Sequence, residues 1–332
     1  MEEHKIVGKA FFLACLVGIV LVLIVFLRSY FFNETRIVFC DVGQGDGAYI
    51  RTKDKIDIII DSGPGPEMAT CLGKYMPFFD RKIELAFLSH PQKDHYGGYE
   101  SILDHYTIDR FVTIPLDNNN ISFNALKKKL LEKKATIINL YRADTVTVGP
   151  KTSLKFIWPT KAFVYANSVV KNTIAQSANT SVLGAYTSSV DLNDFSETFL
   201  FSSGNFDVLF TGDASPRLLG SISNDPILLR TVGNGNNHSD SCSKKTCLSH
   251  SNRLEILKVP HHGSKNGLTV DFLKLADPML SVISVAKKNR YGHPSKEIID
   301  MYQALKKQVI QTKDEGDIKI IIHDDGSWIV GN

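Results

Sequence analysis

Three predicted buried strands in this chain of 332 residues end in polar segments rich in histidine and aspartate. The segments are LSHPQKDHYGG at 88–98, LFTGDAS at 209–215 and LKVPHHGS at 257–264. A fourth segment, NRYGHPS at 289–295, adds His293. Loops held by a rigid sheet are where proteins place chemically active side chains. The pattern therefore favours a fold in which several strands end at one shared rim.

Composition excludes several other classes of protein. The chain is 43% hydrophobic and 22% charged, which excludes a disordered chain, a collagen-like repeat and a protein with many membrane spans. A formal charge of +3 is too small for the whole molecule to attract nucleic acid by its net field. What remains is a globular chain with enough core for an enzyme.

Runs of β-branched residues alternate along the chain with helical patterns. RIVFCD, AYIRT and DIIID, separated by glycine turns, predict an antiparallel meander over 36–61. Strands nearly continuous in Val, Ile and Leu favour sheets covered by helices, an α/β (α+β) fold. Two polar stretches, about 160–192 and 223–252, are interpreted as insertions. Helices are predicted at 67–79, 97–106, 121–134, 268–276 and 295–307.

The first 32 residues read as a separate segment. Eighteen residues without a charge lie between Lys9 and Arg28, and a helix of that length would span roughly 27 Å. A buried core helix and a cleaved signal peptide are the alternatives, but no small-residue cleavage site follows. We expect an uncleaved, single-pass membrane anchor at 1–32. Two basic residues lie near each end of the span, so the positive-inside rule barely decides its orientation. The expected orientation places the N-terminus inside and the large domain, 33–332, outside the cytoplasm.

The five cysteines are too few for a disulfide scaffold. Cys242 and Cys247 lie in a polar loop and are interpreted as a disulfide. A zinc site completed by His238 and His250 is the alternative. Cys40 and Cys71 are interpreted as ordinary buried thiols.

The polar segments carry the side chains of a metal site. Imidazole and carboxylate ligands hold borderline divalent ions such as Zn²⁺ or Mn²⁺. Asp94 and His95 are adjacent, so both can reach one ion, and Asp213 could bridge two. Two ions about 3.5–4 Å apart can hold a hydroxide nucleophile and clamp the oxygens of a phosphoryl group.

The ordered motifs from FCDVGQGDGAYIRT to NRYGHPS resemble the metallo-β-lactamase superfamily, and within it the hydrolase domain of the ComEC/Rec2 competence proteins. The resemblance implies an αββα sandwich with the metal site along one edge. It assigns Asp61 to a supporting role, Asp213 to a bridging role and His293 to a place near the substrate. Asn193 and Ser196 match an N-x-x-S segment. The implied metal ligands are His90, Gln92, Asp94, His95, Asp213 and His262.

One departure from the family pattern bears on the number of ions. Gln92 stands where the superfamily has histidine and the competence proteins usually have aspartate. A neutral amide oxygen is a weaker ligand and offsets none of the metal's charge. The sequence therefore leaves open whether the site holds one ion or two. One interpretation is a single ion held by Asp94, His95, Asp213 and His262. The chain also lacks the many helices of a DNA channel, which excludes DNA transport by this chain alone.

The leading functional hypothesis is a metal-dependent hydrolase of phosphodiesters, a nuclease or phosphodiesterase whose metal-bound hydroxide attacks phosphorus. Asp94 would act at the reacting centre, and His261, Lys265 or His293 would stabilise developing charge. DNA is one candidate substrate, and phosphodiesters of the cell envelope are another. The rival hypothesis is a membrane-tethered binding module that has lost catalysis, which Gln92 favours.

Overall fold

The computed structural model describes residues 2–31, 34–171, 181–232, 246–248 and 254–331. The chain divides into two compact units, Met1–Glu34 and Thr35–Asn332. The first unit contains helix α1 (Glu2–Phe31). Within the described ranges, no helix has both the length and the apolar character needed to cross a membrane. The membrane anchor expected at 1–32 is therefore not supported.

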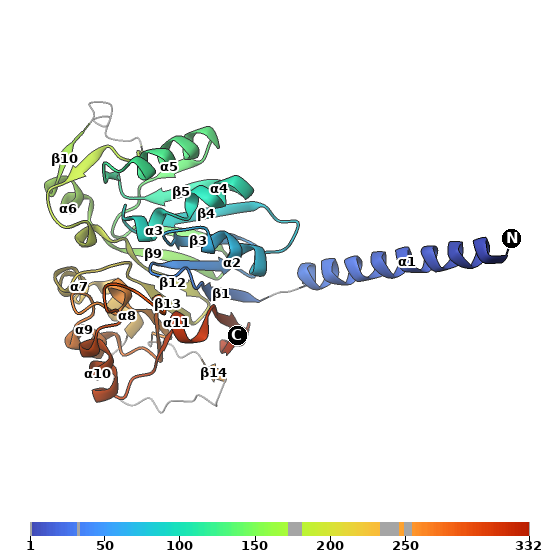
Figure 1. Ribbon diagram of the computed structural model, residues 1–332. Helices are drawn as coiled ribbons and strands as arrows, with labels where there is room; N and C mark the ends of the chain where they lie inside the picture. The colour runs from blue at the N-terminus through green and yellow to red at the C-terminus, as the bar shows by residue number, and fades with distance from the viewer. Residues whose placement is uncertain (1, 32–33, 172–180, 233–245, 249–253, 332) are drawn as a thin grey trace. The chain divides into compact units, whose positions relative to one another are not determined.

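The second unit is built on two large sheets and one small one (Figure 1). The first sheet contains, in spatial order, β14 (Thr246–Leu248), β19 (Ser327–Gly331), β18 (Ile318–Ile322), β1 (Thr35–Phe39), β2 (Gly47–Arg51), β3 (Asp57–Ser62), β4 (Lys82–Leu88), β5 (Thr107–Thr113) and β7 (Thr136–Ile138). The second contains β17 (Val309–Gln311), β16 (Leu280–Ile283), β15 (Ile256–Lys258), β13 (Phe206–Phe210), β12 (Thr198–Ser203), β9 (Thr152–Trp158) and β8 (Thr145–Gly149).

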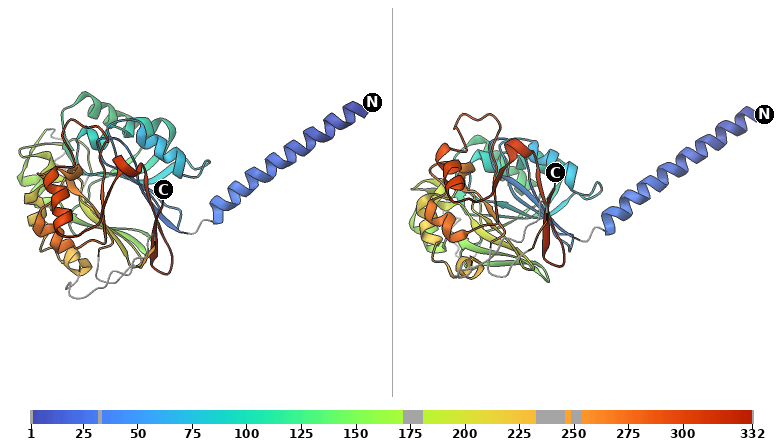
Figure 2. Two further views of the ribbon diagram at one scale, coloured as in Figure 1. Left: turned by 60° about the horizontal axis from the view of Figure 1, so that its bottom comes forward. Right: turned by 90° about the horizontal axis from the view of Figure 1, so that it is seen from below.

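Helices cover the outer faces of both large sheets (Figures 1 and 2). Against the first sheet lie α2 (Glu67–Tyr75), α4 (Tyr99–His105) and α5 (Ile121–Glu132), whose apolar side chains share a core cluster with Val38, Ile59 and Ala86. Against the second lie α7 (Pro216–Ile222), α8 (Pro226–Val232), α9 (Val270–Ala276) and α10 (Lys296–Ala304). The remaining short helices are α3 (Lys93–Tyr96), α6 (Lys161–Ala166), α11 (Thr312–Glu315) and the 3-10 turns η2 (Leu192–Phe195) and η3 (Pro260–Gly263).

A third core cluster fills the space between the two sheets. It contains alternate residues of strands from both, such as Ile37 and Ile58 from the first sheet and Phe199 and Val208 from the second. Alternation arises because successive side chains of a strand point to opposite faces. The four layers confirm the predicted α/β class and αββα arrangement. The predicted meander is also confirmed, because β1, β2 and β3 pair antiparallel.

The first predicted insertion, 160–192, contains α6, β10 (Ser168–Val170) and β11 (Tyr186–Ser188). These strands form the small sheet with β6 (Leu116–Asp117). The second, 223–252, contains α8 and β14, and most of its remainder lies outside the described residues, as do Cys242, His238 and His250. The helix predicted at 67–79 ends earlier, at Tyr75, because Met76 precedes a proline and adopts an extended conformation.

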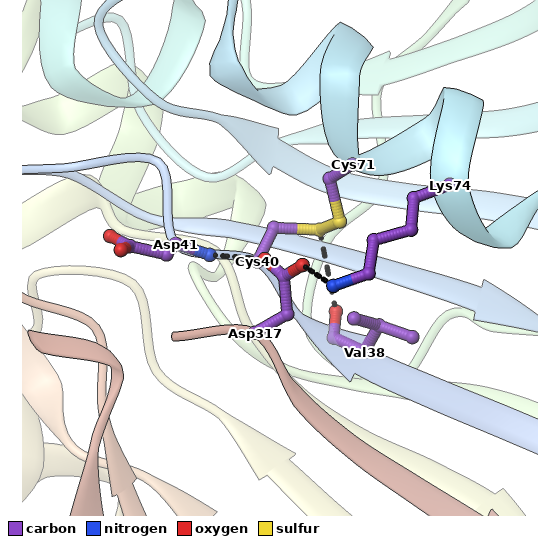
Figure 3. The surroundings of a disulfide bond; sticks show 6 residues. All are labelled: Val38, Cys40, Asp41, Cys71, Lys74 and Asp317. Carbon is purple, nitrogen blue, oxygen red and sulfur yellow. Dashed lines mark hydrogen bonds and ion pairs between the residues drawn. A yellow bond between two sulfur atoms is a disulfide. The ribbon is translucent and has the colours of Figure 1, made fainter. Parts of the chain in front are cut away.

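The interpretation of Cys40 and Cys71 as free thiols was wrong. Their sulfurs form a disulfide that joins the residue after β1 to helix α2, with a Cα–Cα distance of 6.1 Å (Figure 3). Beside it, the Asp317 carboxylate accepts from the Lys74 ammonium at 3.0 Å and from the Asp41 backbone N–H at 3.0 Å. Both cysteines are buried, and 31 positions separate them in the sequence, so their partnership depends on how α2 packs on the sheet.

Candidate metal centre

Three segments from the two large sheets bring four polar residues to one rim of the second unit. Asp94 and His95 lie on α3, just after β4. Asp213 follows β13, and His262 lies on η3 after β15. β4 runs parallel to β3, and β15 runs parallel to β13, so the strands of each pair end on the same side. The topology therefore assembles the site from residues far apart in the sequence.

The ligand atoms of Asp94, His95, Asp213 and His262 all lie within 4.8 Å of one another. Asp213 Oδ1 is 3.2 Å from His95 Nε2 and 3.5 Å from His262 Nε2. Asp94 Oδ2 is 3.6 Å from His262 Nε2. The two histidines and Asp213 are almost completely buried, whereas 29% of the Asp94 side chain is exposed. These four residues, which we call the ligand group, are therefore accessible to solvent on the side of Asp94.

These residues fit a divalent cation. Three atoms that face one another, His95 Nε2, His262 Nε2 and Asp213 Oδ1, are buried without a hydrogen-bond partner. Buried polar atoms normally have a hydrogen-bond partner, so three unpartnered atoms that face one another indicate a place where a ligand binds. Two carboxylates and two imidazoles are the donor set that Zn²⁺ or Mn²⁺ accepts.

The far side of the His95 ring is held by a carboxylate. His95 Nδ1 lies 2.8 Å from Asp61 Oδ2. Asp61 in turn accepts from the Ser89 backbone N–H at 2.8 Å and from the Ser89 hydroxyl at 2.8 Å. A histidine that donates its Nδ1–H in this way presents the Nε2 lone pair to a metal. Asp61 thus lies behind the group and not in it.

His262 is held in a similar way, by residues that the sequence analysis missed. Its Nδ1 faces two acceptors, the Ser284 carbonyl oxygen at 3.0 Å and Asp46 Oδ1 at 3.1 Å. Asp46 is buried and forms an ion pair with the buried Lys258 ammonium, which also donates to the Gly212 carbonyl at 3.1 Å. A signal was present, because a lysine inside the apolar strand LEILKVP needs a buried partner.

The electrostatics of the group follow from this arrangement. Burial opposes ionisation of Asp213, but the imidazoles of His262 and His95 outweigh it and hold its pKa well below the ordinary value. Burial also opposes protonation of His95, but Asp213 and Asp61 overcome it and raise its pKa. Asp94 is desolvated as well, yet its contacts with His262 and His95 lower its pKa to about 2. Both carboxylates therefore stay anionic.

His90 and Gln92 lie apart from the four converging residues. His90 is fully buried, with its ring centre 4.2 Å from that of His95 and its Nε2 without a hydrogen-bond partner. Burial, with the nearby charge of His95, lowers its pKa to about 3, so the ring is neutral. The Gln92 side-chain amide donates to Asn193 Oδ1 at 2.8 Å. Ser196, from the same N-x-x-S segment, accepts from the Asp213 backbone N–H at 3.1 Å.

Three further expected residues lie at different distances from the group. His261 Nε2 is 3.8 Å from Asp213 Oδ2, and 23% of its side chain is exposed. The His293 ring centre is 5.8 Å from that of His261 and 6.5 Å from that of His262. Lys265 is exposed, and no salt bridge among the described residues joins it to the group. His261 and His293 therefore border the site, whereas Lys265 belongs to its surroundings.

Asp46 offers a test of how His262 is oriented. The Asp46→Asn variant is expected to bind Zn²⁺ about tenfold to a hundredfold more weakly, because outer carboxylates fix the ligand's tautomer and basicity. Isothermal titration calorimetry checks this, with the melting temperature of the metal-free protein as a control for folding. Asp41→Asn, an exposed aspartate in the same loop, is the matched variant and should bind normally. Equal affinities in both variants would refute the role of Asp46.

No protein-family model matches the chain. It is similar to ComE operon protein 3 of Bacillus subtilis (strain 168), with 34% identity over 67 residues that cover 20% of this chain and 9% of that protein. It is also similar to Recombination protein 2 of Haemophilus influenzae, with 22% identity over 291 residues, 86% of this chain and 28% of that protein. The chain thus spans less than a third of either relative.

Among solved structures, the chain is similar to Zn²⁺-bound PqqB from Methylobacterium extorquens, with a TM-score of 0.46 and 10% identity over 83% of this chain and 97% of that one. The two sequence relatives agree with the resemblance inferred from the motifs. The chain is therefore related in sequence to parts of these two larger proteins.

Proposed function

We propose that the protein is a metal-dependent hydrolase of phosphodiesters. The observation that carries the proposal is the convergence of Asp94, His95, Asp213 and His262 on one point, with three unpartnered buried atoms. A divalent cation bound there would supply Lewis acidity and lower the pKa of a coordinated water. The protein's own contribution is to hold four ligands in place before any substrate arrives.

The residues that border the group are suited to an anionic substrate. His261 is partly exposed beside Asp213 and can donate an N–H to a phosphate oxygen. Burial, together with the charges of His262 and His261, lowers the pKa of His293, so its neutral ring can donate one N–H and accept at the other nitrogen. Lys265 adds a positive charge at the exposed margin. These groups would orient the phosphate and stabilise its developing charge.

A panel of substrates tests the proposal. Protein purified without chelator is incubated with Mn²⁺ or Zn²⁺ and with bis-p-nitrophenyl phosphate, single- and double-stranded DNA, RNA and choline phosphodiesters. We expect metal-dependent hydrolysis of at least one diester and its loss in Asp94→Ala. Hydrolysis that survives in Asp94→Ala, or activity on none of the diesters, contradicts the proposal. Which diesters are cleaved decides between a nuclease and an envelope phosphodiesterase.

We further propose that the group holds one ion. The Gln92 amide nitrogen donates to Asn193, and the neutral side chain adds no negative charge beside His90 Nε2 to offset that of a second cation. Gln92→Asp is expected to raise the bound Mn²⁺ or Zn²⁺ from one ion per chain to two, because it adds a carboxylate beside His90. Metal analysis by mass spectrometry measures this, and Gln92→Ala, which adds no ligand, should remain at one. Two ions in the parent protein would refute a single-ion site.

The Gln92–Asn193 hydrogen bond also favours a second candidate, a binding module without catalysis. Such a module would bind a phosphodiester through His261 and His293 and leave it intact. Parent protein that binds the cation but cleaves no diester in the panel supports this alternative. Turnover that follows metal content across the variants excludes it.

An extracytoplasmic location is proposed from the Cys40–Cys71 disulfide. Disulfides persist in oxidising compartments and are rare in the cytosol. Cell fractionation with thiols blocked at lysis is expected to recover the protein outside the cytoplasmic fraction with Cys40 and Cys71 oxidised. Recovery in the cytoplasmic fraction with both thiols reduced would contradict the proposal.

A further inference from the structure

The loop between α2 and β4 exposes two adjacent aromatic rings. Phe78 and Phe79 are 72% and 68% exposed, and their ring centres are 5.0 Å apart at an interplanar angle of 85°. The loop projects from the edge of the second unit in Figure 1. A single exposed apolar residue needs no explanation, but a contiguous apolar tip rimmed by polar residues marks an interaction site.

Two basic side chains lie near the two rings, in a depression that Asp80 and Asp104 also line. The Arg81 guanidinium lies 5.7 Å from the centre of the Phe78 ring and 5.2 Å from that of Tyr106. Lys133 lines the same shallow depression as Phe79 and Arg81, with a volume of about 410 Å³. We refer to Phe78, Phe79, Arg81 and Lys133 as the distal patch.

The acidic residues beside the distal patch each lie against a basic side chain, and Asp80 shares the Arg51 guanidinium with the buried Asp57. Asp80 lies 3.2 Å from the Arg51 guanidinium, and Asp104 lies 2.6 Å from the Lys129 ammonium. Among the described residues, Arg81 and Lys133 form no salt bridge with a carboxylate. The positive charge of the patch is therefore available to an external anion.

The distal patch lies at the opposite end of the sheet from the metal centre. The loop leads into the first residue of β4, whereas His90 and Asp94 follow its last residue. Because β1, β3 and β4 all run in the same direction, Thr35, the first residue of β1, lies at the patch's end. A partner bound there leaves the rim with Asp94 and His261 open to substrate.

We propose that the distal patch docks on an anionic lipid surface, with Phe78 and Phe79 in the headgroup region. Aromatic rings favour the membrane–water interface, and basic side chains beside them are attracted by anionic lipids. A second copy of this chain is disfavoured as the occupant, because a two-fold contact would place like charges opposite each other. The perpendicular rings also offer no parallel pair of faces between which a base could insert.

A tryptophan placed in the loop tests this proposal. In full-length Phe79→Trp protein, added to vesicles with one third phosphatidylglycerol, we expect a blue-shifted emission and quenching by lipids brominated near the headgroup. The signal is the difference from the parent protein, which has two tryptophans. This fluorescence difference comes from the tryptophan at position 79, so vesicle binding through other parts of the chain does not produce it. Ile121→Trp is the matched control, because Ile121 is 87% exposed at the start of α5 and should stay unquenched.

A second variant separates the contribution of the two basic side chains from that of the aromatic rings. Arg81→Glu/Lys133→Glu is expected to reduce quenching at position 79 at least threefold on anionic vesicles and to leave the weak signal on neutral phosphatidylcholine unchanged. A solvent-like emission at position 79 in vesicle-bound protein overturns the proposal. Quenching at position 79 that only equals the quenching at position 121 also overturns it. The same holds if self-association of the protein shields the introduced tryptophan, or if only a single-stranded oligonucleotide produces the blue shift.

Discussion

On the proposed function, Asp213→Asn is expected to bind Zn²⁺ or Mn²⁺ far more weakly than the parent protein and to lower phosphodiester hydrolysis by about a thousandfold or more. Asp213 Oδ1 faces the Nε2 atoms of both His95 and His262, so its charge is shared by the whole ligand group. An amide keeps the shape but removes the negative charge that a divalent cation needs. Metal content by mass spectrometry and turnover of bis-p-nitrophenyl phosphate measure the two effects together.

The matched control for this prediction is Asp225→Asn. Asp225 is also a buried carboxylate, paired with Arg142, but it lies at the start of α8 and has no contact with the ligand group. This variant should be less stable and yet keep its ion and its activity per folded molecule. An Asp213→Asn protein that retains a stoichiometric ion would show that the cation is held elsewhere.

Removal of the Cys40–Cys71 disulfide is expected to lower the free energy of unfolding by about 3–4 kcal/mol. The bond closes a loop between residues 31 positions apart, and the estimate is the chain entropy that such a loop removes from the unfolded state. The Cys40→Ser/Cys71→Ser double variant and urea denaturation measure it. Mutation is preferable to a reductant, because a reductant would also cleave any other disulfide formed among the five cysteines.

Cys15→Ser provides the comparison for the disulfide variant. Cys15 is a free cysteine in α1, so its replacement should change the free energy of unfolding of the second unit by less than about 0.5 kcal/mol. A double variant as stable as Cys15→Ser would mean that Cys40 and Cys71 do not form the bond in the folded protein. A larger loss than expected would mean that α2 and the loop before Asp46 unfold together.

Local patterns in the sequence were enough to predict many of the elements and two of the side chains that converge at the rim. The meander over 36–61 and α5 could be predicted because each depends on neighbours within a few residues. In α5, Phe123, Leu126 and Leu130 recur at helical spacing, and the Asn120 side chain accepts from the Ser122 backbone N–H. Asp94 and His95 could also be identified from the sequence as candidate metal ligands, because they are adjacent and follow a buried strand.

The sequence alone determined which side chains were available to hold a metal ion, but the tertiary structure decided which of them meet. His90 and Gln92 lie within five residues of His95, yet neither joins the group. Asp46 and Lys258, which come from different sheets, form a buried pair behind His262. The spacing of residues in the sequence indicates contacts only within one helix or strand. The Asp46–Lys258 pair depends instead on how the two sheets pack against each other. The same reason explains why the Cys40–Cys71 disulfide was visible only in the folded chain.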